Sequence, residues 1–128
     1  MVDIGKQIAY WRNGSDEDWG AAYELVESGR TRHGLFFAHL ALEKMLKAHV
    51  CRATGDLAPR VHNLVRLAEL AGLPLSETQR TFLARFNQYQ LEGRYPDTLT
   101  TPPEVGEAEE ELEQAEAMLQ WFSNQFST

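Results

Sequence analysis

Apolar side chains recur along this sequence at the three- and four-residue spacing that is typical of helices. The pattern is strongest in residues 31–54, where apolar positions cover nearly the whole circumference of a helix drawn at about 100° per residue. We predict one long, central helix there, ended by Gly55. No stretch alternates apolar and polar side chains as a half-buried strand would. The expected fold class is therefore all-α, an up-and-down helical bundle of four to five helices.

One bundle helix is expected before the central one, with a short leading helix ahead of it. Residues 1–12 carry apolar positions at helical spacing, and Asn13 followed by Gly14 is expected to break the chain. Ser15 resembles the N-cap of a second helix, which should end at Gly29. The N-terminal part is thus predicted to be a short leading helix followed by a longer one.

Two further helices are expected after the central one. Residues 62–71 have the spacing of a short helix, and Gly72 should stop it. Ser76 and Gln79 stand three residues apart, as in a capping box, and so predict the start of another helix. That helix is expected to continue to Gly93.

The chain should end in a loop and one more long helix. Residues 94–101 are predicted to be the loop, with Thr101 as the next N-cap and Pro102 at the first helical position. The apolar positions beyond them alternate steps of three and four residues, which is typical of a bundle seam. These positions are Val105, Ala108, Leu112, Ala115, Leu119, Phe122 and Phe126.

The size and composition suit one globular unit. The chain has 128 residues, and we expect a single domain over residues 1–128 with its core in about 15–126. The single cysteine, Cys51, excludes an intrachain disulfide and is interpreted as a core residue. No apolar run approaches the ~20 residues of a membrane span, so we expect no membrane contact and a cytoplasmic location.

The net charge of −7 is distributed unevenly. Residues 30–66 carry seven basic side chains against two acidic ones, whereas residues 97–128 carry eight acidic side chains and no basic one. One interpretation is that the basic segment faces the acidic C-terminal helix, within the fold or across a dimer. The other is that the basic segment faces phosphate groups of a ligand.

The common sequence motifs for cofactors and metals are absent. There is no glycine-rich phosphate loop, no dinucleotide fingerprint, no Cys-x-x-Cys and no His-Glu-x-x-His. The four histidines are scattered along the chain, which argues against a shared metal site. We therefore expect no metal and no cofactor.

One charged pair falls on the apolar central helix. Glu43 and Lys47 are four residues apart, in the order that favours a helix ion pair. Because they lie between Phe36, Leu40 and Val50, they are expected either to reach solvent at an edge or to be buried with a third partner. Arg94 and His62 are the two candidates for that partner.

Arg94 and Tyr95 are candidates for ligand contacts. They come directly after a predicted helix end, where loop residues on a rigid scaffold are often functional. Arginine offers a planar fork to phosphate, and tyrosine offers a face to a base. Alternatively, Arg94 caps helix carbonyls or pairs with Glu43 while Tyr95 packs. His62 is either a cap for its helix or a site residue.

Three motifs together resemble the HEPN domain family. Residues 37–48 (FAHLALEKMLKA) are similar to its helix with the pattern A-x-E-K-x-L-K-A after an aromatic residue. His62-Asn63-Leu64 matches a short H-x-L helix, and Arg94-Tyr95-Pro96 matches the R-Y-P element after the fourth helix. Residues 22–29 fit the first helix. The order and spacing agree over about residues 15–126.

The resemblance implies a helical bundle that is usually dimeric and often encoded beside a minimal nucleotidyltransferase, in some cases as a toxin–antitoxin pair. Several branches are metal-independent RNases with an R-x(4–6)-H motif near the fourth helix. Here that spacing runs only from Arg32 to His39, on the long helix, and no histidine follows His62. What remains resembles the non-catalytic, nucleotide-associated branch.

We therefore predict a HEPN-type accessory module that binds nucleotide or RNA, forms a homodimer and partners a nucleotidyltransferase. The predicted binding residues are Glu43, Lys44, Lys47, His62, Arg94 and Tyr95. An alternative is a metal-independent RNase toxin, in which His62 and Arg94 would be catalytic. A second alternative is a structural interaction module with no ligand.

Overall fold

The computed structural model of the protein describes residues 2–94 and 101–127, which form six α-helices and no strand. This confirms the predicted all-α fold class. The helices are α1 (Ile4–Glu27), α2 (Thr31–Thr54), α3 (Leu64–Leu70), α4 (Glu77–Phe86), α5 (Gln88–Arg94) and α6 (Val105–Gln125). No helix within those ranges is long and apolar enough to span a membrane.

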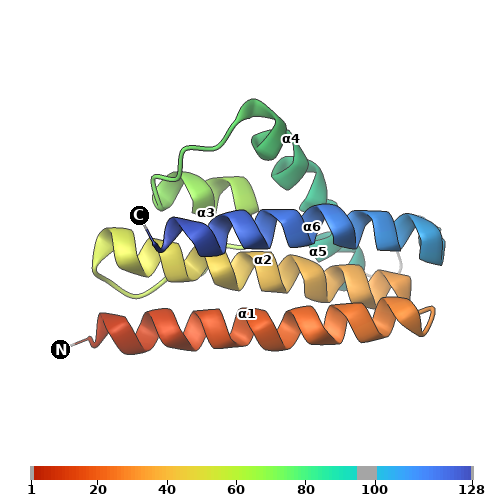
Figure 1. Ribbon diagram of the computed structural model, residues 1–128, viewed down its shortest axis with the longest axis horizontal. Coiled ribbons are helices and arrows are strands. Elements are labelled where there is room, and N and C mark those ends of the chain that lie inside the picture. The colour runs from red at the N-terminus through yellow and green to blue at the C-terminus, as the bar shows by residue number, and fades with distance from the viewer. Residues whose placement is uncertain (1, 95–100, 128) are drawn as a thin grey trace.

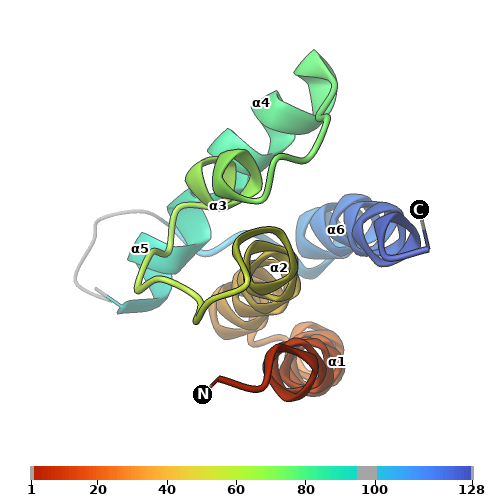
Figure 2. The ribbon, with the colours of Figure 1, turned by 90° about the vertical axis from the view of Figure 1, so that its left-hand side faces the viewer.

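α2 is the centre of the bundle, as its sequence predicts. α1, α2 and α6 run side by side along the molecule (Figure 1), and the end-on view shows α1 and α6 on two sides of α2 (Figure 2). The shorter helices α3, α4 and α5 form a second layer beside α2. Because helices surround it, 15 of the 24 residues of α2 are buried. It begins and ends where its sequence predicts, and Gly55 closes it with a φ of 67°.

α1 is a single helix, so the predicted break at Asn13-Gly14 is wrong. Tertiary packing explains the difference, because α1 lies along α2 for its whole length. The Ser15 hydroxyl is buried and donates a hydrogen bond of 2.7 Å to the Ala41 carbonyl of α2, so Ser15 is not an N-cap. The N-cap is Asp3, whose side chain accepts from the Lys6 amide.

The short helices differ in part from their predictions. The capping box of Ser76 and Gln79 is confirmed at the start of α4. The predicted helix to Gly93 is interrupted at Asn87, which separates α4 from α5. Arg94 is the last residue of α5 and not part of a loop.

The start of the last helix also differs from its prediction, because residues 102–104 are not helical. Thr101 does not cap this helix, which begins at Val105 with Glu104 as its N-cap. The Thr31 hydroxyl donates a hydrogen bond of 2.6 Å to the Pro103 carbonyl, which ties this stretch to the start of α2. The rest of the predicted loop, residues 95–100, lies outside the described residues. Within α6, the seam positions Ala108, Leu112, Ala115 and Phe122 are buried, together with Met118.

A tight contact between α1 and α2 at Gly34 generates a stability prediction. A Cβ atom on Gly34 would lie 2.5 Å from the Val26 Cγ2 atom and 2.9 Å from the Ala22 carbonyl oxygen. The backbone oxygen cannot move aside without displacing α1. Gly34→Ala is therefore expected to lower the free energy of unfolding by about 1–3 kcal/mol, in spite of alanine's higher helix propensity.

Gly20→Ala is the matched control for that substitution. Gly20 is also helical, but nothing lies within 4 Å of its added Cβ. This variant is expected to be stabilised by about 0.5–1 kcal/mol, because alanine favours the helix. Urea unfolding measures both variants. A Gly34→Ala protein as stable as Gly20→Ala would contradict the tight contact between α1 and α2.

Candidate functional site

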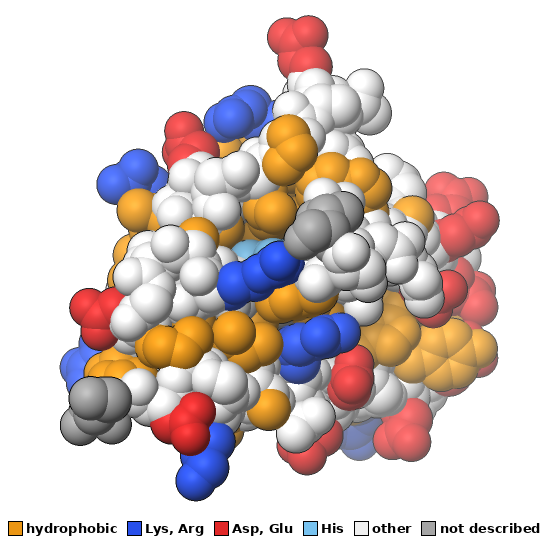
Figure 3. Space-filling model, turned by 60° about the vertical axis from the view of Figure 1, so that its left-hand side comes forward, with side chains coloured by type: hydrophobic (Ala, Val, Ile, Leu, Met, Phe, Trp, Pro, Cys, Tyr) orange, Lys and Arg blue, Asp and Glu red, His pale blue; other side chains and the backbone are white. Residues whose placement is uncertain are grey.

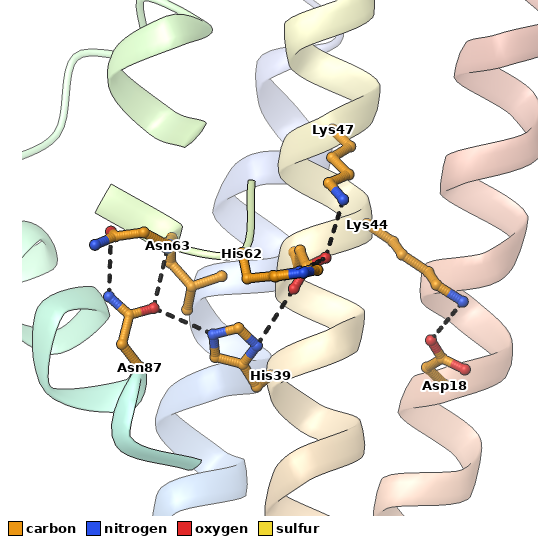
Figure 4. Close-up of polar contacts among 9 residues, drawn as sticks. Asp18, His39, Lys44, Lys47, His62, Asn63 and Asn87 are labelled. Carbon is orange, nitrogen blue, oxygen red and sulfur yellow. Dashed lines mark hydrogen bonds and ion pairs between the residues drawn. The ribbon is translucent and has the colours of Figure 1, made fainter. Parts of the chain in front are cut away.

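The site is organised around the buried carboxylate of Glu43 on α2. The Oε2 atom of Glu43 lies 3.0 Å from the Lys47 Nζ atom and 3.0 Å from the His62 Nδ1 atom (Figure 4). The Glu43 and Lys47 side chains are only 5% and 8% exposed. Of the two predicted outcomes for this pair, burial with a third partner is the one observed. The partner is His62 and not Arg94.

Lys47 is enclosed between a carboxylate and an aromatic ring. Its Nζ atom lies 5.2 Å from the centre of the Trp11 ring of α1. Removal of an ammonium group from water is costly unless an opposite charge compensates it. Glu43 supplies that charge, and the Trp11 ring adds a favourable cation–π contact. The Lys47 ammonium group therefore interacts mainly with Glu43 and Trp11 inside the protein, and little with a ligand at the surface.

His62 presents one edge of its ring to Glu43 and is otherwise half exposed. It precedes α3, and Asn63 is the N-cap there, accepting from the Arg66 amide. His62 is therefore not the cap of this helix. Because the Glu43 carboxylate can only accept, the His62 Nδ1 atom donates to it. A neutral imidazole held in this way carries its lone pair on Nε2.

His39 extends the cluster into the core. Its Nε2 atom lies 3.1 Å from the Asn87 Oδ1 atom. The same oxygen accepts from the Leu64 amide at 3.0 Å, and the Asn87 Nδ2 atom donates to the Asn63 side chain. These contacts fix which end of the Asn87 amide is oxygen. The His39 Nε2 atom must therefore be the donor.

The other nitrogen of His39 faces Glu43. The His39 Nδ1 atom lies 3.7 Å from the Glu43 Oε1 atom, and neither has a hydrogen bond to any described residue. Burial lowers the pKa of His39, outweighing the hydrogen bond to Asn87 and the charge of Glu43. A neutral His39 that donates from Nε2 turns the Nδ1 lone pair toward the carboxylate. Two buried acceptors then face each other.

The sequence contains only a weak signal for this part of the cluster. His39 and Glu43 are four residues apart on an apolar helix, as Glu43 and Lys47 are, but such histidine–glutamate pairs are common. Asn87 gives no signal at all, because it falls inside the helix that the sequence predicts to continue to Gly93. Its contacts with α2 and α3 depend on tertiary packing.

The remaining predicted site residues have different surroundings. Arg94 is exposed at the end of α5, and its guanidinium carbon lies 5.9 Å from the centre of the Phe36 ring on α2. No described ion pair joins it to Glu43. Lys44 points toward α1, where its Nζ atom lies 2.8 Å from the Asp18 Oδ2 atom (Figure 4). Tyr95 lies outside the described residues.

The surface at the end of the bundle where both termini lie combines basic and apolar groups. Figure 3 brings this end forward and shows Lys or Arg side chains beside a histidine, among hydrophobic side chains. No group of three or more His, Cys, Asp or Glu side chains among the described residues could hold a metal ion. Cys51 is buried, as predicted, and burial raises the pKa of its thiol, which disfavours a nucleophilic thiolate.

The buried histidine generates a prediction about pH. The pKa of His39 is below its ordinary value of 6.5 in the folded protein, so the unfolded chain binds this proton first as pH falls. The contribution of His39 to stability is therefore flat above about pH 6.5 and decreases below it, with a slope of up to about 1.4 kcal/mol per pH unit. His49, whose pKa burial also lowers, adds to the slope in the same direction. Urea unfolding between about pH 5 and 8 measures the slope.

His39→Gln is expected to remove this share of the slope, whatever its effect on the overall stability. His33→Gln, at an exposed position of α2, is the control and should retain the full slope. NMR of the imidazole nitrogens at neutral pH should also show the His39 proton on Nε2. A proton on Nδ1 would contradict the orientation inferred for Asn87.

Comparison with known proteins agrees with the resemblance in the motifs. The family model described as the HEPN domain matches residues 8–125. Among solved structures, the chain is similar to TT1696 from Thermus thermophilus, with 23% sequence identity and a TM-score of 0.76 over 92% of this chain and 97% of that chain. No curated protein matches. The structural likeness shows a shared fold, and the family match over residues 8–125 shows that this chain belongs to the HEPN domain family.

Proposed function

We propose that this protein is a HEPN-type accessory module that binds nucleotide or RNA through phosphate contacts at His62 and Arg94. We further propose that it acts as a homodimer beside a minimal nucleotidyltransferase, in a toxin–antitoxin-like system. The observation that carries the proposal is the half-exposed His62 ring, anchored through Nδ1 to a buried carboxylate. This contact fixes the orientation of the ring, and the Nε2 atom makes no hydrogen bond with a described residue.

The Glu43 carboxylate suits His62 to an anionic ligand. The carboxylate holds the ring through Nδ1, and an Nε2–H group on that ring would donate to a phosphate oxygen. Arg94, exposed on α5, adds a permanently charged planar donor. Both groups come from segments that pack on α2, so the ligand would meet a rigid support.

The predicted binding residues then have different roles. Arg94 and His62 contact phosphate, and Tyr95, next to Arg94 in sequence, stacks on a base. Glu43 positions His62. Lys47 compensates the charge of Glu43 and, from its buried position, attracts the phosphate more weakly. Lys44 contributes least, because its ammonium group pairs with Asp18.

Two exposed apolar side chains that lie near the site residues in the sequence support the proposed dimer. Leu57 lies in the segment that leads to His62, and Leu91 lies three residues before Arg94 on α5. They are 55% and 54% exposed. A second protomer that covered them would bring its own copy of the site close to the first.

The second candidate is a metal-independent RNase, and the Glu43–His62 pair favours it specifically. A carboxylate that accepts from Nδ1 leaves the Nε2 lone pair for general base catalysis. Arg94 would stabilise the charge that develops on the phosphate. This candidate needs both groups close to the same phosphate.

Titration with ATP tests the leading proposal. We expect saturable binding at submillimolar to millimolar concentration, with a rise in the melting temperature. Arg94→Ala should weaken binding about tenfold or more, because it removes a charge-assisted hydrogen bond. Arg80→Ala, at an exposed arginine of α4, is the matched control and should bind like the parent protein.

Two other results would replace this proposal. Cleavage of single-stranded RNA in EDTA, abolished by His62→Ala and by Arg94→Ala, would favour the RNase. If millimolar ATP neither binds nor raises the melting temperature, and Arg94→Ala only lowers stability, the structural interaction module is favoured.

A further inference from the structure

α1 and α6 enclose a groove on the side of α2 away from α5. Each of these helices packs against α2 far more than against the other, and the end-on view shows α5 and α6 on opposite sides of α2 (Figure 2). Two hollows of about 320 Å³ and 210 Å³ lie along this groove. Both are lined by Trp19 of α1 and Glu116 of α6, so the two hollows adjoin at these residues.

The floor of the groove is apolar. Met45 of α2 lies at its base, and Trp19 and Leu119 line its walls. Leu112 and Tyr23 continue the apolar lining in the second hollow. Trp19 and Leu119 are only partly buried, and the Tyr23 side chain is 55% exposed. This much accessible aromatic and aliphatic surface in one depression favours contact with another apolar surface.

The rims of the groove are acidic and unpaired. Five exposed carboxylates line it, and none of them makes an ion pair with a described residue. They are Asp16 and Glu27 on α1 and Glu109, Glu113 and Glu116 on α6. By contrast, Glu111 on another face of α6 accepts hydrogen bonds from Arg85 and Tyr89. The groove is thus complementary to a partner that is apolar along one stripe and basic on both sides of it.

We propose that this groove binds a basic amphipathic helix of a partner protein. The lining residues of α1 span positions 15–27, about 20 Å of helix, which corresponds to three to four turns of a partner helix. Two helices that both lie against a third leave a position for a fourth, as in a four-helix bundle. Apolar side chains of the partner would occupy the floor, and its lysines or arginines would pair with the rims.

A second copy of this chain does not offer such a helix within the described residues. α1 and α6 carry the acidic rims themselves, and α2 is buried among the others. α3 and α5 have seven residues each and are shorter than the groove. α4 has Arg80 and Arg85 on its surface, but its apolar side chains Phe82, Leu83 and Phe86 are in the core. The complementary surface therefore belongs to a different protein.

A synthetic peptide of ~16 residues tests the proposal, with leucines at i, i+3, i+4 and i+7 and lysines at the remaining positions. A matched peptide with glutamate in place of every lysine is the control. NMR titration of the full chain should show saturable one-to-one binding of the lysine peptide. The shifted resonances should lie in residues 15–27 and 109–123, and the glutamate peptide should not bind.

Charge reversal on α6 separates the groove from the overall acidity of the protein. Glu113→Lys with Glu116→Lys, both on the rim, should weaken binding of the lysine peptide about tenfold or more. Glu107→Lys with Glu110→Lys makes the same change in net charge on residues that do not line the groove. That control should change the affinity less than about twofold.

Three outcomes would overturn the proposal. Equal weakening by the two double variants would show that attraction is only to the net charge. Shifts confined to the surface of His62 and Arg94 would place the peptide at the other site. Shifts of groove resonances with protein concentration alone would show that a second copy occupies the groove. None of these outcomes depends on whether ATP binds at His62 and Arg94.

Discussion

A carboxylate buried in the middle of an apolar helix has to be compensated, because removal of an unpaired charge from water costs several kcal/mol. Glu43 is such a group, and its compensation connects three parts of the chain. Lys47 lies one turn further along α2 and reaches the Trp11 ring of α1, while His62 comes from the segment before α3. The polar cluster thus joins α1 and the segment before α3 to the middle of α2, and it places a supported imidazole at the surface.

The second half of the cluster shows how a polar network selects one packing. Asn87 connects α2 and α3 with two side-chain contacts, to His39 and to the Leu64 amide. The helical register is interrupted at this residue, between α4 and α5. A network of this kind tolerates few alternatives, because a shift of one helix would leave several buried polar atoms without partners.

The charge asymmetry in the sequence acquires a meaning only when the two faces of the bundle are compared. The basic segment does not neutralise the acidic last helix among the described residues, since the ion pair that reaches α6 comes from Arg85 of α4. Lys44 and Lys47 pair with Asp18 and Glu43 instead. The glutamates that line the groove between α1 and α6 therefore have no basic partner among the described residues, and they lie on one side of α2. Arg94 and His62 belong to segments that pack on another side of α2.

The sequence by itself determined the features that depend on neighbours along the chain. The bounds of α2, its glycine cap, the capping box of α4 and the Glu43–Lys47 pair all follow from spacing within one helix, where i+3 and i+4 contacts are set by helix geometry. Family membership could be inferred for the same reason, because its motifs are short and local.

The tertiary structure alone decided the rest. Asn13-Gly14 stays helical because α2 supports α1 there, and Asn87 divides a predicted helix where its side chain bonds to α2 and α3. The contact of Glu43 with His62 rather than Arg94 is also long-range, and so is the ion pair of Lys44 with Asp18. Local propensities differ by about 1 kcal/mol or less, so packing between distant segments overrides them.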